Sequence, residues 1–369
     1  MDSAEELRSV VDALRDSPEF LAGWLAYTPG GDSWLSERLG LDQARMERLL
    51  LCRSPRPSSF PTEVQGIASL VEVAPEALAA ALREGAALTT LSAAGQVGAD
   101  VEEVAAAAGL LAAARDTADE TISRGTVGGS YIRRLAEDVR ARAPRDADAI
   151  LDVESFVAWS APLAVVLLPD LNLATADNWL AERGVALGFG KPNRPLRGLL
   201  LAWRGNGLIF VDGSLSMSER RFTVAHELGH FLLNYYEPRF QVLRRAPDLV
   251  EVLDGHRRAT TQDRTRAVLE RIHLGVHTHL LDRDPHGNAA WEVEQGEDMS
   301  SRFALELLSP WKAVRTTLSR IANDMPWPAK LSEATRLLEA EFQLPGDAAR
   351  TRARAALDAI GKGPGLFER

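Results

Sequence analysis

Residues 221–236 read RFTVAHELGHFLLNYY, and this run decides how the chain around it is organised. It places His226, Glu227 and His230 in an H-E-x-x-H pattern. Side chains four residues apart lie on one face of a helix, so both histidines can direct a ring nitrogen at the same metal ion. Glu227 stands beside that position, where a carboxylate can take a proton from a water instead of binding the metal. The run therefore predicts a metal-binding helix equipped for hydrolysis.

The boundaries of this helix can be predicted from the flanking residues. Ser216 and Glu219 form the S-x-x-E pattern of a capping box, and Pro238 is expected to end the helix. Gly229 costs about 1 kcal/mol relative to Ala inside a helix, so another element or a substrate is expected to pass close to it. A buried body is predicted from Phe222, Val224, Leu228, Phe231, Leu232 and Leu233. The simpler alternative is a core helix with two incidental histidines.

A second run, at residues 297–310, reads EDMSSRFALELLSP. Together the two runs resemble the ImmA/IrrE family of metallopeptidases, whose pattern is R-F-T-x-A-H-E-x-G-H-x-L followed by E-x-x-A-N-x-F-A-x-x-L-L-x-P. The resemblance covers about residues 130–342. This chain departs from the pattern at Ser300 and Ser301, where Ala-Asn is usual, and at Asn234, where a further His is common. These departures leave the ligands in place but alter the groups expected to orient them.

The resemblance implies a zinc site made by His226, His230 and Glu297 in a compact α/β domain, with Glu227 as the catalytic acid and base. Glu227 would take a proton from the attacking water and return it to the leaving amine. Family members cleave or antagonise repressors in stress responses and in the control of mobile elements. The resemblance therefore implies a zinc-dependent endopeptidase that acts on one or few proteins, such as a transcriptional repressor or regulator.

The family pattern also selects the third ligand among neighbouring carboxylates. Glu297 stands six residues before Phe303 and one turn before Ser301, as the pattern requires. The carboxylates that do not match it are Glu292, Glu294 and Asp298.

Two questions about the site stay open in the sequence. The group that stabilises the oxyanion is one: Tyr235, Tyr236 and the later histidines are candidates, although both tyrosines can simply pack the helix end. The other is whether the chain is a catalyst or a regulator that only senses a signal or holds a metal. A fourth protein ligand, such as His273 or His277, would close the site and favour a structural metal.

Composition indicates a chain of two or three globular domains. It has 369 residues, 46% of them hydrophobic, and a net charge of −10. The single cysteine, Cys52, excludes an intramolecular disulfide and a cysteine-rich metal site. The N-terminus is acidic and polar, and the longest apolar run, residues 161–169, is too short to span a bilayer. We therefore expect a cytoplasmic protein without membrane contact.

Residues 1–124 are expected to form a helical domain that resembles helix-turn-helix proteins. Residues 1–120 carry nine Arg, no Lys and twenty Asp or Glu, a balance of −11 that opposes contact with DNA phosphates. Three segments fit a helix, turn and helix: residues 35–46, 67–78 and 91–104. Only the first lies in a cationic cluster, which consists of Arg38, Arg45, Arg48, Arg53 and Arg56. A helical scaffold or protein-docking domain is favoured over a DNA-binding domain.

The remaining chain is expected to be α+β and mostly helical. A linker is predicted at residues 125–130, and a zincin-like peptidase domain at 131–310 with an insert at 237–290. A helical region is expected at 311–369. Strands are predicted at 161–168, 196–202 and 207–212, the last two as a hairpin that leads into the metal helix.

The insert explains why 66 residues separate His230 from Glu297. Asp263 is expected to cap a helix whose apolar stripe covers the site as a lid. The stripe consists of Leu269, Ile272, Val276 and Leu280. His273 and His277 lie four apart beside it and either bind a metal or pack.

Overall fold

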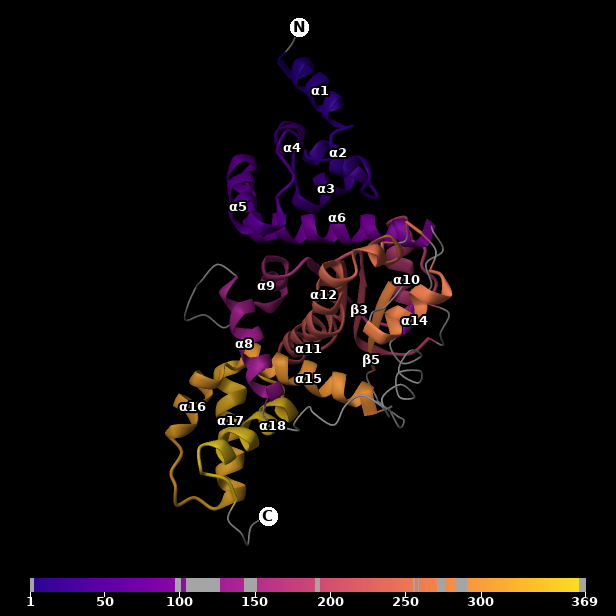
Figure 1. The fold of residues 1–369 in the computed structure, drawn as a ribbon. Helices are drawn as coiled ribbons and strands as arrows, with labels where there is room; N and C mark the ends of the chain where they lie inside the picture. The colour runs from indigo at the N-terminus through magenta and orange to yellow at the C-terminus, as the bar shows by residue number, and fades with distance from the viewer. Residues whose placement is uncertain are drawn as a thin grey trace.

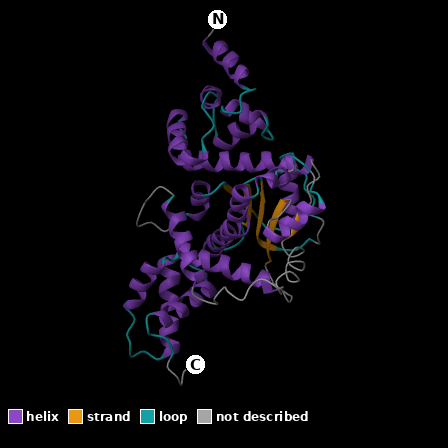
Figure 2. Cartoon of the chain, in the orientation of Figure 1, coloured by secondary structure: helices purple, strands orange, loops and turns teal. Residues whose placement is uncertain are grey.

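The computed structural model describes residues 3–96, 101–103, 127–142, 151–189, 193–254, 256–257, 259–270, 276–282 and 291–364. Helices make up most of this part of the chain, and a five-stranded sheet lies among them (Figure 1, Figure 2). The predicted class, α+β with a predominance of helix, is confirmed.

The N-terminal region is a set of short helices followed by one long helix. Their bounds are α1 Ser3–Leu14, α2 Leu21–Ala26, α3 Gly31–Leu39, α4 Gln43–Leu50, α5 Phe60–Val71 and α6 Pro75–Gln96, with a 3₁₀ turn at Pro57–Ser59. Gly40 ends α3 in the left-handed conformation, and the Asp42 side chain caps α4. The first two predicted helix-turn-helix segments therefore fall on α3–α4 and α5–α6.

The third predicted helix-turn-helix segment, residues 91–104, is wrong. Helix α6 continues through Gln96, and Val101–Glu103 forms strand β1. This strand is also an exception to the expectation that the first 120 residues are entirely helical. It was missed because its pairing partner lies more than 170 residues further along the chain.

The sheet has the strand order β1-β5-β3-β4-β2. The other strands are β2 Leu163–Leu168, β3 Leu196–Trp203, β4 Asn206–Asp212 and β5 Val276–Asp282. Strands β3 and β4 form the predicted hairpin, and Arg204 and Gly205 take positive φ values of 49° and 84° in its turn. Strand β5 pairs antiparallel with β3 and parallel with β1, while β2 pairs parallel with β4.

Both faces of the sheet are apolar. Successive residues of a strand point to opposite sides, so the apolar strands contribute buried side chains to each face. One face packs on α6 and on α10 Leu173–Glu182. The other packs on α11 Met217–His230 and α15 Trp291–Leu308. The strand residues buried with α6 are Ala164, Val166, Leu196, Leu199, Leu201, Trp203, Leu208 and Phe210. Those buried with α11 are Leu163, Leu200, Ala202, Ile209 and Val211.

The helical run that begins with α11 does not end at Pro238, where the sequence predicted its end. The chain stays helical, first as a π-helical segment at Phe231–Tyr236 and then as α12 Glu237–Arg245. Pro238 lies in the first turn of α12, directly after the π-helical segment. A π-helical stretch next to a metal motif is typical of functional sites in helices.

Only part of the predicted insert is helical, and its role as a cover stays a prediction. After α12 the chain forms a 3₁₀ turn at Pro247–Leu249, α13 Val250–Leu253 and α14 Thr261–Glu270, and then enters the sheet as β5. The predicted apolar stripe is wrong, because Val276 and Leu280 lie in β5. Ile272 and His273 lie outside the described residues. The helices have a small core of their own, made by Val242, Ala246, Leu249 and Leu253.

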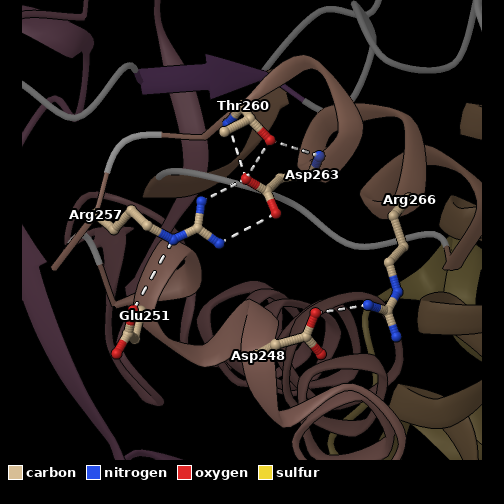
Figure 3. A network of polar contacts seen from close by, with 6 residues as sticks. All are labelled: Asp248, Glu251, Arg257, Thr260, Asp263 and Arg266. Atoms are coloured by element: carbon tan, nitrogen blue, oxygen red, sulfur yellow. Dashed lines mark hydrogen bonds and ion pairs between the residues drawn. The ribbon is translucent and has the colours of Figure 1, made fainter.

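Asp263 stabilises the start of α14 from inside the helix and not as its cap residue. Its carboxylate accepts hydrogen bonds from Thr260 N and Oγ1, at 2.8 and 2.7 Å, while Thr260 Oγ1 accepts from Asp263 N (Figure 3). This is a capping box with Thr260 at the cap. Arg257 adds an ion pair to the same carboxylate, and Arg266 bridges to Asp248 at 2.7 Å (Figure 3). These contacts hold α14 against the chain that precedes it.

The predicted C-terminal helical region packs on the same core as the metal helix. It comprises α16 Trp311–Ser319, α17 Trp327–Phe342 and α18 Gly346–Ala359. Arg352 of α18 donates to Glu306 Oε1 at 2.9 Å and to the Ser309 carbonyl at 2.7 Å, both at the end of α15. Helices α8 Val127–Ala141 and α9 Val153–Ser160 complete this layer.

The predicted domain boundaries stay a prediction. Four residues of the proposed linker, 127–130, are the first residues of α8. Ala158 and Trp159 of α9 pack into the N-terminal helical cluster, so the regions share buried surface.

Among the described residues, no single helix is long and apolar enough to cross a membrane. The 57–71 and 75–94 segments reach that length only as a pair, bent by 113°.

Candidate metal centre

Helix α11 positions the two histidines and Glu227. The predicted capping box is confirmed: Ser216 caps the helix, and its side chain and that of Glu219 each accept a backbone N–H from the other residue. His226 and His230 are 2% and 4% exposed, and Glu227 is fully buried. The Nε2 atoms of the two histidines lie 3.1 Å apart. One face of α11 therefore presents both imidazoles to the same point.

Helix α15 brings Glu297 to that point. Gly229 makes the approach possible, because a Cβ at this position would lie 3.1 Å from the Cα of Ser300 on α15. The element expected to pass close to Gly229 is therefore α15. Glu297 Oε2 lies 3.2 Å from His226 Nε2, and Oε1 lies 3.6 Å from His230 Nε2. Of the neighbouring carboxylates, Asp298 pairs with Arg302 on the exposed side of the helix.

These separations fit a metal site. Four donors about 2.1 Å from a tetrahedral zinc ion lie about 3.4 Å from one another. The three separations among His226, His230 and Glu297 are 3.1, 3.2 and 3.6 Å. Imidazole nitrogen and carboxylate oxygen are ligands that suit zinc. The residues therefore fit the metal that the H-E-x-x-H pattern implies.

Strand β5 adds a fourth side chain, His279, which the sequence reading did not single out. Its Nδ1 lies 2.8 Å from Glu227 Oε2, and its Nε2 lies 2.7 Å from Glu297 Oε1. The His279 ring stacks on His230, with centroids 3.5 Å apart and planes 17° apart. The ligand atoms of His226, His230, His279 and Glu297 all lie within 4.8 Å of one another. The centre is thus a cluster of three histidines and two glutamates.

Charge and burial oppose each other in this cluster. Burial lowers the pKa of His279, but the charges and hydrogen bonds of Glu227 and Glu297 outweigh it and raise the pKa to about 10. For His230, burial and the positive charge of His279 lower the pKa to about 4. Burial raises the pKa of Glu227 and of Glu297, yet the neighbouring histidines hold both below the ordinary value. Both carboxylates are therefore ionised beside His279.

The carboxylate of Glu227 is enclosed between α11 and β3. A Cβ at Gly198 of β3 would lie 2.8 Å from Glu227 Oε1 and 2.8 Å from Thr223 Cγ2. Only a residue without a side chain leaves this space. Among the described residues, Oε1 has no hydrogen-bond partner, whereas Oε2 has His279. The Glu227 side chain is thus held at Oε1 by packing against β3 and at Oε2 by the imidazole of His279.

Ser301 supplies the group that orients His226. Its Oγ lies 3.2 Å from His226 Nδ1, the ring nitrogen that faces away from the cluster. A hydrogen bond at the distal nitrogen of a ligating histidine fixes its tautomer and its orientation. Ser300, the other departure from the family pattern, is fully buried against Gly229. Ser301 thus contacts the ring of a proposed ligand, whereas Ser300 allows α15 to pack closely on α11.

Several other candidates lie outside the cluster. Tyr235 uses its hydroxyl to accept the N–H of Gly205 at 2.8 Å, and burial raises its pKa to about 12. Tyr236 stacks on Phe231. His277 is buried with its ring 5.4 Å from that of Tyr235. Both tyrosines pack the helix end, as the simpler reading expected, and His273 lies outside the described residues.

Comparison with known families agrees with the motif. Residues 191–251 match the model of the Peptidase_M78 family, described as the IrrE N-terminal-like domain, which is the ImmA/IrrE family. The matched segment contains His226, Glu227 and His230 but ends before His279 and Glu297. No curated protein and no solved structure matches the chain. The match identifies a peptidase-like segment of a metallopeptidase family.

Proposed function

Because residues 191–251 match the IrrE N-terminal-like domain, we propose that the chain is a zinc-dependent endopeptidase. The observation that carries this proposal is the convergence of α11 and α15. It brings His226, His230 and Glu297 to ligand spacing, with Glu227 beside them. A bound zinc ion would polarise the scissile carbonyl and make an attacking water more acidic.

Within this proposal, Glu227 moves the proton. It lies one residue from His226 on the same helix, and its Oε2 faces the cluster through His279. Glu227 takes a proton from the attacking water at Oε2 and returns it to the leaving amine. In the conformation described here Oε2 accepts from His279 Nδ1, so it has to exchange that partner before it acts as the base.

The proposed substrate is a protein, and the family resemblance favours a transcriptional repressor or regulator. Peptidases can hold an extended segment by adding it to the edge of a sheet. The strand nearest the metal cluster is β5, but its outer side is paired with β1 at Val276–Thr278. An extended substrate therefore cannot pair with this part of β5 while β1 stays in place.

The test separates metal binding from proton transfer. We predict that the purified chain holds about one zinc ion and that Glu227→Gln keeps the metal while cleavage of a protein substrate is lost. His226→Ala and His230→Ala are expected to lose the metal, because each removes one donor of three. Zinc is measured by elemental analysis, and cleavage by mass spectrometry of candidate repressors.

His256→Ala is the matched control, because His256 is an exposed histidine on the α13–α14 connection. It is expected to retain both metal and cleavage. Cleavage by Glu227→Gln at the wild-type rate would overturn the assignment of the base.

The second candidate function is a regulator whose peptidase-like domain holds a metal structurally. His279 favours it, since a fourth donor lies where an open site would keep a water. Metal bound without cleavage in the wild type and in His279→Ala would support this alternative.

A further inference from the structure

We propose that His279 is a fourth protein ligand of the metal, and that Glu227 is the carboxylate that orients it. The inference rests on the proposed function in that it uses the same metal centre. It goes further, because it assigns a donor that neither the motif nor the matched family segment contains.

The backbone fixes where His279 lies. Strand β5 runs between β3 and β1, and His279 pairs with Leu200 of β3. Its side chain is only 12% exposed and points toward α11 and α15, as its contacts with Glu227 and Glu297 show. A side chain carried by a paired strand is positioned more precisely than one on a loop.

The two ring nitrogens of His279 have different neighbours. Nε2 lies among the proposed ligand atoms, 2.7 Å from Glu297 Oε1. Nδ1 lies 2.8 Å from Glu227 Oε2, on the other side of the ring. The two nitrogens can therefore serve different roles, Nε2 toward the proposed ligand atoms and Nδ1 toward the Glu227 carboxylate.

A histidine binds a metal through an unprotonated ring nitrogen, and Nε2 is the nitrogen of His279 that faces the other proposed donors. The Nδ1–H would keep its bond to Glu227. Carboxylate, histidine and metal would then form the series that most ligating histidines show.

This arrangement has a functional consequence. His226, His230, His279 and Glu297 together provide four protein donors, which is the number in closed structural zinc sites. Glu227, fully buried and bound to His279, is not available to a water. With His279 bound, the centre would be closed, and hydrolysis would require His279 to leave the metal.

The ligand set can be counted directly on the zinc-loaded full-length chain. X-ray absorption spectroscopy at the zinc edge is expected to show three imidazole ligands in the wild type, two in His279→Ala and three in His256→Ala. Competition with a chelator is expected to show at least tenfold weaker zinc binding by His279→Ala.

The wild-type spectrum decides the proposal even if His279→Ala fails to fold. Two imidazoles in the wild type would overturn it, as would unchanged zinc affinity in a folded His279→Ala. Cleavage that depends on Glu227 together with a count of two would leave the proposed function standing and remove this inference. Three imidazole ligands in the wild type, with no cleavage by the wild type or by His279→Ala, would support this inference and contradict the proposed function.

Discussion

Gly198 and Gly229 determine how closely the backbone approaches the cluster of three histidines and two glutamates. Gly229 lets α15 pass against α11, and Gly198 lets β3 pass over the Glu227 carboxylate. Neither glycine has a positive φ, so their role is one of space and not of backbone conformation. The centre thus depends on two residues that contribute no chemistry.

Gly198→Ala tests whether the enclosure of Glu227 matters. The new methyl group would lie 2.8 Å from both Glu227 Oε1 and Thr223 Cγ2, and Thr223 is stiff because it is β-branched. The carboxylate therefore has to move. We expect the variant to keep about one zinc ion per chain and to cleave at least tenfold more slowly, as displaced catalytic groups do. Zinc analysis and initial cleavage rates measure the two effects.

Gly66→Ala is the matched control for this substitution. Gly66 lies exposed in α5, and a Cβ there meets no atom within 4 Å. Replacement is expected to raise the unfolding free energy by about 0.5–1 kcal/mol and to leave cleavage unchanged. A wild-type cleavage rate in Gly198→Ala would show that Glu227 does not need its present position.

The site residues that could be predicted are those fixed by short-range geometry. His226, Glu227 and His230 belong to one helical turn, and Glu297 belongs to a second run with its own pattern. His279 depends on the pairing of β5 with β3, which is a contact over almost eighty residues. The alternation of V-H-T-H-L at 276–280 is a local signal for a strand. The same segment also places Val276 and Leu280 four apart, which fits a helix equally well.

At the scale of elements, the segment between α11 and α15 has two parts with different roles. Helices α12 and α13 share a small core, tied to the β3–β4 turn by the bond from Arg204 Nε to the Asp254 carbonyl at 2.7 Å. Helix α14 is joined to them by the pair of Arg266 with Asp248. Strand β5 belongs to the sheet and carries His279. The lid hypothesis therefore applies only to the first part.

Two replacements separate these roles. A short Gly-Ser linker in place of residues 246–270 leaves β5 intact and is expected to keep the zinc content while broadening the range of cleaved proteins. The same linker in place of 239–288 removes β5, and we expect at least tenfold weaker zinc binding because His279 is lost. Zinc affinity and cleavage of unrelated proteins are measured for both chains.

The comparison between the two chains is the control. Loss of zinc by the 246–270 replacement would mean that α13 and α14 help to build the centre. Unchanged zinc affinity in the 239–288 replacement would contradict the role given to β5.

At the scale of the whole molecule, the predicted domains are joined by shared cores. Helix α6, from the N-terminal region, covers one face of the sheet whose other face carries the metal helix. Arg83 of α6 donates to the Ala158 carbonyl at 3.1 Å, and Trp159 packs against Phe60. Composition and periodicity predicted these helices, but the surfaces on which they pack depend on contacts between distant segments. Strand β1 then links the end of the N-terminal region to β5, beside His279.

These contacts bear on whether the N-terminal region reads DNA. Three of the five arginines in the cationic cluster form ion pairs with carboxylates of the same region. Arg38 lies 3.2 Å from Glu84, Arg45 lies 3.2 Å from Asp42, and Arg56 lies 2.6 Å from Glu63. Arg48 and Arg53 are the members for which the described residues show no such pair. The charge of a paired arginine is already balanced by its carboxylate, so the arginine contributes less to binding of phosphates.

We therefore predict weak and weakly salt-dependent binding of the intact chain to duplex DNA. Each neutralised phosphate contributes about −0.9 to the slope of log K against log salt concentration. For binding through this cluster, two available arginines give a slope no steeper than about −2, and the −11 balance of residues 1–120 lowers affinity further. Fluorescence anisotropy between about 50 and 200 mM salt measures this slope. Sub-micromolar binding to a defined sequence, lost in Arg48→Ala with Arg53→Ala, would instead assign DNA recognition to α3 and α4 and support the regulator function.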